Sequence, residues 1–281
     1  MKVDLNLIDA ETVREYHENG VCVVRNLISP EWIARMGDAV DRILASPGPS
    51  SLEYTPAGKS GRYYGDFFLW RRDPDFNAFM RSEALVQLAA EFMQPEEIRF
   101  FYDQLLVKEP QTQEHTPLHQ DLPYWPLRGE QIISIWAGFD PVTEDAGAVQ
   151  YIKGSHRWGK FYAPATFGSN SDFAEIYKKA GLEEMPDPDR LIREGEMLHW
   201  DLAPGDVVVH HPLVLHYSPG NLTATGRRRG LALRYIGEDV TWDDREGTFV
   251  KNPHLSKSLP DINLADGEHV HGQLFPVVWK R

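Results

Sequence analysis

The chain has 281 residues, 42% of them hydrophobic, and this length allows one large domain or two small ones with a sizeable core. Its formal net charge of −13 argues against binding to nucleic acids or to anionic membranes, although a local basic pocket could still hold a small anion. The single cysteine, Cys22, excludes a disulfide within the chain, and no apolar stretch reaches the ~18 residues that a membrane span needs. Because the N-terminal segment is too acidic for a secretory signal, we expect a cytoplasmic protein, either a monomer or a homodimer.

The first third of the sequence predicts helices that support a later sheet. Residues 9–19 begin with an aspartate N-cap, and the segments that begin at Ser29 and Ser82 also combine a capping residue with helical apolar spacing. The segment 46–61 is rich in Pro, Gly and Ser and predicts a mobile loop. We therefore expect helical support over about residues 9–95.

Aromatic residues cluster at 63–70, in a stretch that is compatible with two interpretations. The stretch is a buried core strand, or it forms a wall of a substrate cavity, because ligand pockets are also lined by aromatic side chains. On the second interpretation, the substrate-binding residues are Tyr63, Phe67 and Trp70, together with Tyr124 and Trp125 further along.

From residue 99 onward, the pattern changes to strands separated by turn signals. Short apolar runs predict strands at 100–107, 132–139, 149–152 and 207–209, and 227–235 is the last clear core strand. Helices followed by a series of strands are typical of a mainly β fold with flanking helices, built as a sandwich or a barrel. Since no internal repeat and no linker divides the chain, we expect residues 1–281 to form a single domain.

Two segments depart from this regular order. Residues 160–200 contain a predicted short helix from Ser171 towards Gly181 and an acidic linker, which is more than a connection between strands needs. This insertion is either a lid over a site or a plain surface loop. The tail from about Thr241 is expected to be irregular and largely polar.

Two His-x-Asp triplets are candidates for a metal site, His119-Gln-Asp121 and His199-Trp-Asp201. In a strand, residues two apart lie on the same side, so either triplet can present an imidazole and a carboxylate together. Two histidines and one carboxylate on one face of a metal ion leave positions open for small molecules. The second triplet lies directly before a Pro-Gly-Asp turn, where we expect its aspartate to have a structural role, so we favour the first triplet.

The third ligand is open on chemical grounds, because three histidines share the segment 210–216. On a strand, His210 and His216 face one way and His211 faces the other. Pro212 interrupts the hydrogen-bond ladder of such a strand, so the alternation need not hold. A single histidine is also compatible with a hydrogen-bonded core residue.

The order of the motifs resembles that of the phytanoyl-CoA dioxygenase family. The resemblance is carried by His119-Gln-Asp121 with Leu122-Pro-Tyr-Trp-Pro126, Trp136, Gly147, Gly154-Ser-His156, Gly205-Asp206, His211-Pro-Leu and His216. It begins at Gly20 and extends to about Tyr235, so it covers most of the chain. The resemblance implies a double-stranded β-helix, which is a jelly-roll fold, and the use of iron(II), 2-oxoglutarate and dioxygen.

The resemblance also implies roles for individual residues. The iron ligands, and thus the catalytic residues, are His119, Asp121 and His216. An arginine on the strand after the third ligand binds the distal carboxylate of 2-oxoglutarate, since a buried carboxylate needs a permanently charged, fork-shaped partner. Arg228 matches the family pattern best, and Arg227 is the alternative because it lies at the usual distance from the third ligand. The positions that line the iron or cosubstrate pocket are Gln104, Trp136 and Ser218.

The expected activity is hydroxylation of an aliphatic C–H bond in a small-molecule metabolite, with release of succinate and carbon dioxide. Halogenases similar to the family replace the carboxylate ligand with a small residue, whereas this chain keeps Asp121, so hydroxylation is favoured over halogenation. Desaturation, ring formation or epimerisation with the same cofactors, and a β-barrel that binds a metabolite without turnover, are the alternatives. No polybasic stretch suits the phosphates of coenzyme A, although Arg71-Arg72 and 227–229 could bind a smaller anion.

Overall fold

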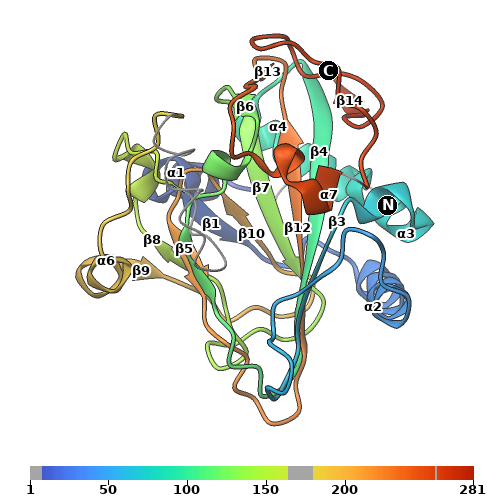
Figure 1. Ribbon diagram of the computed structural model, residues 1–281, viewed down its shortest axis with the longest axis vertical. Helices are drawn as coiled ribbons and strands as arrows, with labels where there is room; N and C mark the ends of the chain where they lie inside the picture. Colours follow the sequence, from blue (N-terminus) through green and yellow to red (C-terminus); the bar gives the residue numbers. More distant parts are fainter. Residues whose placement is uncertain (1–7, 164–179, 257) are drawn as a thin grey trace.

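Two antiparallel sheets face each other in the middle of the molecule, as Figure 1 shows for the computed structural model, which describes residues 8–163, 180–256 and 258–281. The larger, eight-stranded sheet contains, in spatial order, β1 (Val21–Val24), β10 (Val207–His210), β7 (Ile132–Gly138), β12 (Arg228–Ile236), β4 (Glu97–Lys108), β3 (Tyr63–Phe67) and β2 (Leu52–Glu53), and β14 (Val277–Lys280) also pairs with β4. The four-stranded sheet contains β5 (Thr116–His119), β11 (His216–Ser218), β8 (Gln150–Ile152) and β9 (Met197–Leu198). A further pair joins β13 (Thr241–Trp242) and β6 (Leu127–Arg128). The predicted mainly β, jelly-roll class is confirmed.

Helices begin where the capping residues of the sequence predict. Asp9 accepts a hydrogen bond from the Thr12 N–H at 2.8 Å, and Ser29 accepts one from the Trp32 N–H at 3.3 Å. The α-helices are α1 (Ala10–Asn19), α2 (Pro30–Ala45), α3 (Pro74–Met80), α4 (Glu83–Met93), α6 (Pro188–Glu194) and α7 (Pro253–Ser256). The short 3-10 helices are η2 (Leu69–Arg71), η3 (Leu122–Tyr124), η4 (Ser155–Arg157) and η5 (Phe249–Lys251). No helix in the described ranges is long and apolar enough to span a membrane.

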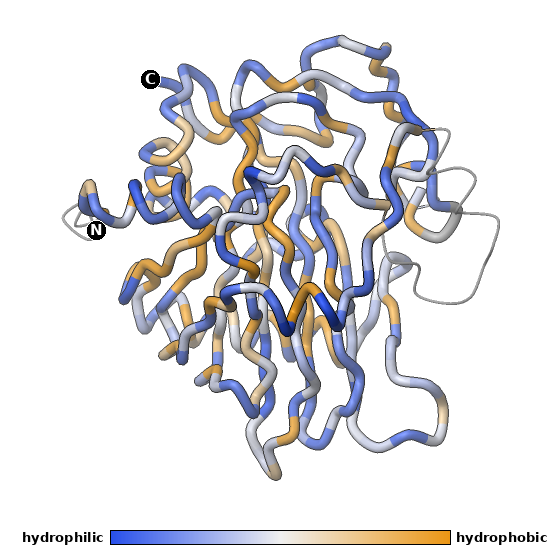
Figure 2. The backbone as a smooth tube through the Cα atoms, turned by 90° about the vertical axis from the view of Figure 1, so that its left-hand side faces the viewer, coloured by the Kyte–Doolittle hydropathy of each residue, from blue (hydrophilic) through white to orange (hydrophobic). Residues whose placement is uncertain are grey.

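Helices cover the outer face of the larger sheet (Figure 1). Alternate residues of β12 therefore face either these helices or the interior between the two sheets. Leu231 and Leu233 belong to an apolar cluster that includes Met36 of α2. Ala232, which lies between these two leucines, belongs instead to a second cluster around Trp136. Figure 2 shows how hydrophobic and hydrophilic residues both recur along the strands in the middle of the molecule. Because strand side chains alternate, the even-numbered residues from Arg228 to Arg234 face the interior between the sheets, before the register shifts at Tyr235.

The prediction that the chain after Thr241 is irregular and largely polar is wrong in part. Strands β13 and β14 form there, and Phe249 and Phe275 are buried against Phe101 of β4, with ring centroids 5.8 and 5.5 Å away. The short apolar run Leu274-Phe-Pro-Val-Val-Trp279 is of the kind that predicts a strand, and the sequence prediction missed it. Phe249 has one apolar neighbour, Val250, in a polar stretch, so local pattern does not reveal its burial.

The insertion predicted at 160–200 lies partly outside the described residues. Residues 164–179, which include the start of the helix predicted at Ser171, are not described. In the described part, Asp187 caps α6 and β9 pairs with β8, so the predicted acidic linker ends in a helix and a strand. The loop predicted at 46–61 contains β2, which pairs with β3.

Candidate metal and cosubstrate site

Three side chains meet at the smaller sheet and form a candidate metal centre. His119 on β5 and His216 on β11 are direct cross-strand partners, and their ring centroids lie 4.2 Å apart. Asp121 follows β5, and its Oδ1 lies 3.6 Å from Nε2 of His119 and 3.9 Å from Nε2 of His216. The three ligand atoms lie within 4.8 Å of one another, and the described residues contain no other such group of His, Cys, Asp or Glu.

Hydrogen bonds to the backbone orient both imidazoles. Nδ1 of His119 lies 2.8 Å from the Pro117 carbonyl oxygen, and Nδ1 of His216 lies 3.0 Å from that of Val214. Since a carbonyl oxygen only accepts hydrogen bonds, Nδ1 carries the proton in each ring and Nε2 keeps its lone pair for a metal ion. Burial holds the pKa of His216 well below its usual value, so this ring stays neutral, as a metal ligand must be.

A row of polar residues on the larger sheet holds the far side of the Asp121 carboxylate. Ser134 on β7 is the direct partner of His210 on β10 and of Arg234 on β12. Oδ2 of Asp121 lies 3.2 Å from the Ser134 hydroxyl, 3.4 Å from Nε2 of His210 and 3.5 Å from a terminal nitrogen of Arg234. Burial disfavours the charged carboxylate, but Arg234, and after it His119 and His210, hold the pKa of Asp121 well below its usual value. Oδ2 is thus engaged by the sheet, and Oδ1 is left for a metal ion.

This donor set fits iron(II). Two neutral imidazoles and one carboxylate oxygen on one side of the ion are the ligands of non-haem iron(II) oxygenases. The residues that hold the carboxylate from behind set the orientation of its free oxygen, as outer-shell partners of metal ligands generally do.

The second His-x-Asp triplet does not join this site. The His199 side chain is 37% exposed and lies 3.9 Å from Glu144, and Asp201 is exposed. The His210 and His216 rings lie 4.9 Å apart, whereas the His211 ring lies 5.1 Å from that of His156, as expected if His211 points the other way along the strand.

At the other end of β12, Arg228 is buried without a carboxylate partner among the described residues. Its side chain donates to the Ser218 hydroxyl at 2.7 Å and to the Gly147 carbonyl at 3.1 Å, and its guanidinium lies 5.5 Å from the centre of the Trp136 ring. Its Nε has no hydrogen-bond partner in the described chain. Burial lowers the pKa of Arg228, yet a guanidinium stays charged in proteins. A buried permanent cation of this kind calls for an anion from outside the protein.

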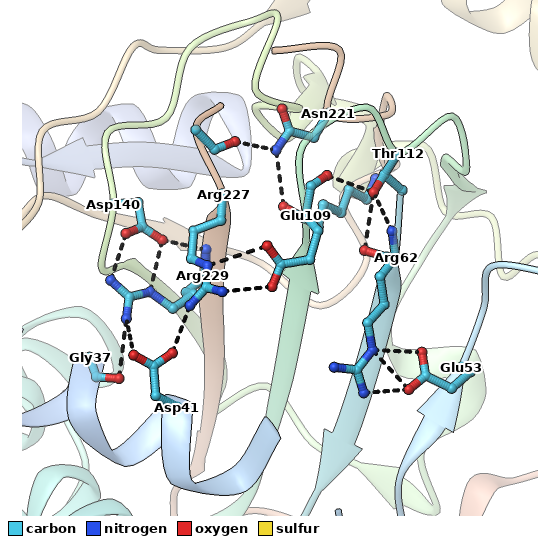
Figure 3. A network of polar contacts seen from close by, with 12 residues as sticks. Gly37, Asp41, Glu53, Arg62, Glu109, Thr112, Asp140, Asn221, Arg227 and Arg229 are labelled. Atoms are coloured by element: carbon cyan, nitrogen blue, oxygen red, sulfur yellow. Dashed lines mark hydrogen bonds and ion pairs between the residues drawn. The ribbon is translucent and has the colours of Figure 1, made fainter. Parts of the chain in front are cut away.

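The two arginines beside Arg228 point to the outer side of the sheet and are already paired (Figure 3). Arg227 lies 2.7 Å from Asp41 of α2 and 3.0 Å from Glu109. Arg229 lies 2.7 Å from Asp140 and donates to the Gly37 carbonyl of α2. The structure therefore places Arg228, and not Arg227, in the interior.

The interior near Arg228 suits a ligand rich in hydrogen-bond acceptors. Nε1 of Trp136 and the hydroxyl of Tyr151 are buried and have no hydrogen-bond partner among the described residues. A Cβ at Gly230 would lie 2.3 Å from the Trp136 ring, so glycine is what lets the indole occupy this position. A 2-oxo dicarboxylate brings both the acceptors and the negative charge that this region lacks. The residues present therefore fit 2-oxoglutarate.

The remaining predicted cosubstrate residues lie at the two ends of the interior. Ser218 contacts Arg228, as described above. Gln104 lies at the metal end, where its Oε1 accepts a hydrogen bond from Arg234 at 3.1 Å.

Two of the five predicted substrate residues contact β5, which carries His119. Tyr124 contacts the metal centre edge-on, with its ring 5.9 Å from that of His119, and the Tyr63 hydroxyl is hydrogen-bonded to Thr116 at 2.7 Å. The other three are buried among core aromatics: Phe67 stacks on Tyr102, Trp125 donates to the Tyr102 hydroxyl at 2.7 Å, and Trp70 packs edge-on against Phe100.

Sequence reasoning missed Lys108, Ser134 and Arg234, and it gave His210 no role beside Asp121. Strand parity was the available signal for two of them. Arg234 lies six residues after Arg228 on β12, and Lys108 lies four residues after Gln104 on β4. Each of these pairs therefore shares one face of its strand.

Comparisons with known proteins agree with this geometry. Residues 16–230 match the family model of phytanoyl-CoA dioxygenase (PhyH). The chain is 27% identical to the peroxisomal phytanoyl-CoA dioxygenase of Rattus norvegicus over 297 residues, which covers 99% of this chain and 82% of the relative. It is 28% identical to a probable alpha-ketoglutarate-dependent hypophosphite dioxygenase of Stutzerimonas stutzeri over 238 residues, which covers 82% of this chain and 79% of that protein.

Solved structures share the fold over nearly the whole length. The non-heme alpha ketoglutarate dependent carbocyclase SnoK from nogalamycin biosynthesis superposes with a TM-score of 0.75 at 21% identity, over 99% of each chain. The epimerase SnoN in complex with Fe3+, alpha ketoglutarate and nogalamycin RO superposes with a TM-score of 0.75 at 16% identity, over 96% of this chain and 98% of SnoN. Since the family model matches well over half of the sequence, the chain belongs to the phytanoyl-CoA dioxygenase family of iron(II)- and 2-oxoglutarate-dependent enzymes.

Proposed function

We propose that the chain uses iron(II), 2-oxoglutarate and dioxygen to hydroxylate an aliphatic C–H bond of a small molecule. The observation that carries this proposal is one interior that contains both the His119, Asp121 and His216 group and the uncompensated cation of Arg228. A 2-oxo dicarboxylic acid can use both groups, because its keto acid chelates a metal ion and its distal carboxylate pairs with a buried cation. When bound, iron(II) with 2-oxoglutarate supplies the activation of dioxygen that an unreactive C–H bond requires.

The chain's own residues hold and orient these groups. His119, His216 and Oδ1 of Asp121 are the proposed metal ligands. Arg228 is the proposed partner of the distal carboxylate, with the Ser218 hydroxyl fixing its guanidinium. Burial of Asp121, His216, Ser218 and Arg228 limits the access of water and strengthens the electrostatic contacts, and His119 is the partly exposed member of the group.

The substrate is proposed to be a metabolite smaller than a coenzyme A ester. The arginines that could bind phosphates are engaged: Arg72 pairs with Asp66, Arg71 donates to a backbone carbonyl, and Arg227 and Arg229 pair with acids as Figure 3 shows. Tyr124, which contacts His119, is the predicted substrate residue that we place beside the reacting C–H bond.

Reconstitution with iron(II) tests the proposal. Purified protein should bind 2-oxoglutarate without oxygen and release succinate when oxygen is admitted, and Asp121→Ala should abolish this turnover. If the iron-loaded protein failed to bind 2-oxoglutarate, and His119→Ala left the metal content unchanged, the proposal would be wrong.

A second outcome with the same cofactors is ring closure or epimerisation, because the carbocyclase SnoK and the epimerase SnoN share this fold. Labelled dioxygen separates the outcomes once a substrate has been identified by screening. Hydroxylation places one labelled oxygen atom in the product, whereas cyclisation and epimerisation place none.

A metabolite-binding protein without turnover is the alternative from another class. The complete ligand triad and the buried Arg228 speak against it. Succinate formation in the absence of substrate that depends on Asp121 would exclude it.

We also propose one catalytic domain over residues 1–281 in the cytoplasm, as a monomer or homodimer. The single cysteine, Cys22, is buried and free, as is usual in a reducing compartment. Cell fractionation checks the location, and light scattering checks the oligomeric state.

A further inference from the structure

Lys108 lies beside Arg228 in the interior and has no role in the functions assigned above. The two residues are direct cross-strand partners on β12 and β4, and Tyr63 on β3 is the partner of Lys108 on its other side. Direct partners lie on the same face of a sheet, so both cations belong to the interior. Lys108 is 0% exposed, and its Nζ lies 4.6 Å from the centre of the Tyr63 ring.

One hydroxyl group connects the two cations. Nζ of Lys108 donates to the hydroxyl and the carbonyl oxygen of Ser218, both at 3.1 Å, and to the Pro219 carbonyl oxygen at 2.5 Å. Arg228 donates to the same Ser218 hydroxyl at 2.7 Å, and that hydroxyl donates to the Gly147 carbonyl at 2.9 Å. The Lys108 amine and the Arg228 guanidinium therefore donate to the same oxygen atom, and the other acceptors around them are neutral carbonyls.

The described residues supply little negative charge to this pair. In the described chain, no carboxylate oxygen lies within 4 Å of the side-chain nitrogens of Lys108 or Arg228. The acid whose charge affects Lys108 is the half-buried Glu114. Glu114 already accepts a hydrogen bond from Thr55 at 3.0 Å. Burial, and then Arg228, hold the pKa of Lys108 well below its usual value, which reflects the cost of a second cation there without an anion. A neutral donor could satisfy the same backbone carbonyls, so hydrogen bonding alone does not explain a lysine at this position.

We propose that Lys108 is a second cation for the distal carboxylate of the 2-oxo acid and makes the site selective for dicarboxylic over monocarboxylic 2-oxo acids. The inference rests on the proposed function, because it takes Arg228 as the direct partner of that carboxylate. An anion bound to Arg228 lies at short range from the Lys108 amine and favours its protonated form, and it is then attracted by that charge in a buried region where charges are weakly screened. Lys108 is therefore a specificity-determining residue.

The test compares two acids that differ at their distal end. Protein loaded with manganese(II) is titrated calorimetrically with 2-oxoglutarate and with 2-oxobutyrate, which has the same keto acid but no distal carboxylate. Lys108→Gln removes the charge and keeps N–H donors for the carbonyls of Ser218 and Pro219. It should weaken 2-oxoglutarate binding by about 10- to 100-fold and 2-oxobutyrate binding by less than about threefold.

Two control variants accompany this comparison. Lys108→Arg keeps the charge and should keep most of the selectivity. Lys153→Met removes an exposed lysine that pairs with Glu196, and should change neither affinity.

Equal weakening of both acids by Lys108→Gln, or unchanged selectivity, would overturn the inference. Failure of the unmodified protein to bind 2-oxoglutarate would instead contradict the proposed function, so the two failures are distinguishable. If the variants do not fold, a crystal structure of the unmodified protein with manganese(II) and 2-oxoglutarate decides. A distal carboxylate within about 6 Å of the Lys108 nitrogen supports the inference, and a carboxylate bound elsewhere overturns it.

Discussion

Strand β12 carries a buried arginine near each end, and the two differ in what neutralises their charge. Arg234 lies 3.5 Å from Asp121 and donates to Gln104, so its charge faces a carboxylate of the protein itself. Arg228 lies six residues earlier, about 20 Å away along an extended strand. It contacts a hydroxyl and a carbonyl, and the buried cation of Lys108 lies beside it.

This difference follows from the proposed ligand at each end of the strand. A metal ion is a cation and needs a negatively charged protein ligand, so Arg234 can partly balance the charge of Asp121 and orient its carboxylate. A dicarboxylate brings its own negative charge, so the cations that receive it are left without a protein partner. Since uncompensated buried charge costs several kcal/mol, we expect 2-oxoglutarate to stabilise the fold as well as to react in it.

Removing the negative charge at the metal end should have the largest effect. Asp121→Ala deletes one of three ligands and leaves Arg234 without its carboxylate, so metal content should fall to background and succinate formation by at least about 10³-fold. Metal analysis and a succinate assay measure this. Asp201→Ala, in the second His-x-Asp triplet, is the matched control and should change neither the metal content nor succinate formation. An Asp121→Ala protein that retained stoichiometric iron would contradict the ligand assignment.

Removing the cation at the other end should leave the metal in place. Arg228→Met should weaken 2-oxoglutarate binding by about 10²- to 10³-fold, because a buried carboxylate loses its direct partner, while metal content stays unchanged. Calorimetry of the metal-loaded protein measures the affinity. Arg227→Met, directly before this strand and paired with Asp41 and Glu109, should change it less than about threefold. A larger effect at Arg227 than at Arg228 would reverse the assignment of the two arginines.

Arg234 offers a sharper separation of the two ends. Arg234→Met should weaken metal binding by about 10- to 100-fold, as loss of an outer-shell partner of a ligand does. The ratio of 2-oxoglutarate to 2-oxobutyrate affinity at saturating metal should stay the same. Arg234→Lys should recover part of the metal affinity. Should Arg234→Met alter the ratio and spare the metal, the two ends would not be independent.

The smallest expected effect comes from a substitution at Gly230, which lies between the two arginines on β12. Gly230→Ala forces a Cβ into the Trp136 ring, so it should destabilise the fold by about 1–3 kcal/mol and lower the melting temperature by a few degrees. Gly226→Ala is the matched control, because a Cβ there meets its nearest atom at 3.5 Å, which is an ordinary contact. Thermal unfolding followed by circular dichroism compares the two. Equal melting temperatures would show that Trp136 moves freely.

Much of the barrel could be predicted from the residues of individual strands. The predicted strands at 100–107, 132–139 and 227–235 correspond closely to β4, β7 and β12. The first two are largely apolar runs, and the third is recognisable from Leu231, Ala232 and Leu233 between arginines. The tail behaves differently. Phe249 lies in a polar stretch without a strand or helix pattern, and its burial comes from packing against Phe101 of β4.

Residue type, local spacing and the order of motifs were enough to predict the candidate ligands, the strands of the core and the face of β12 on which Arg228 lies. Spacing could not choose between His119-Gln-Asp121 and His199-Trp-Asp201, which read alike. The turn after the second triplet and the family resemblance favoured the first, and the pairing of β5 with β11 is what brings His216 beside His119. Tertiary structure also decided that one buried arginine has a carboxylate and the other has none, because residues far apart in the chain meet only through the register of the sheets.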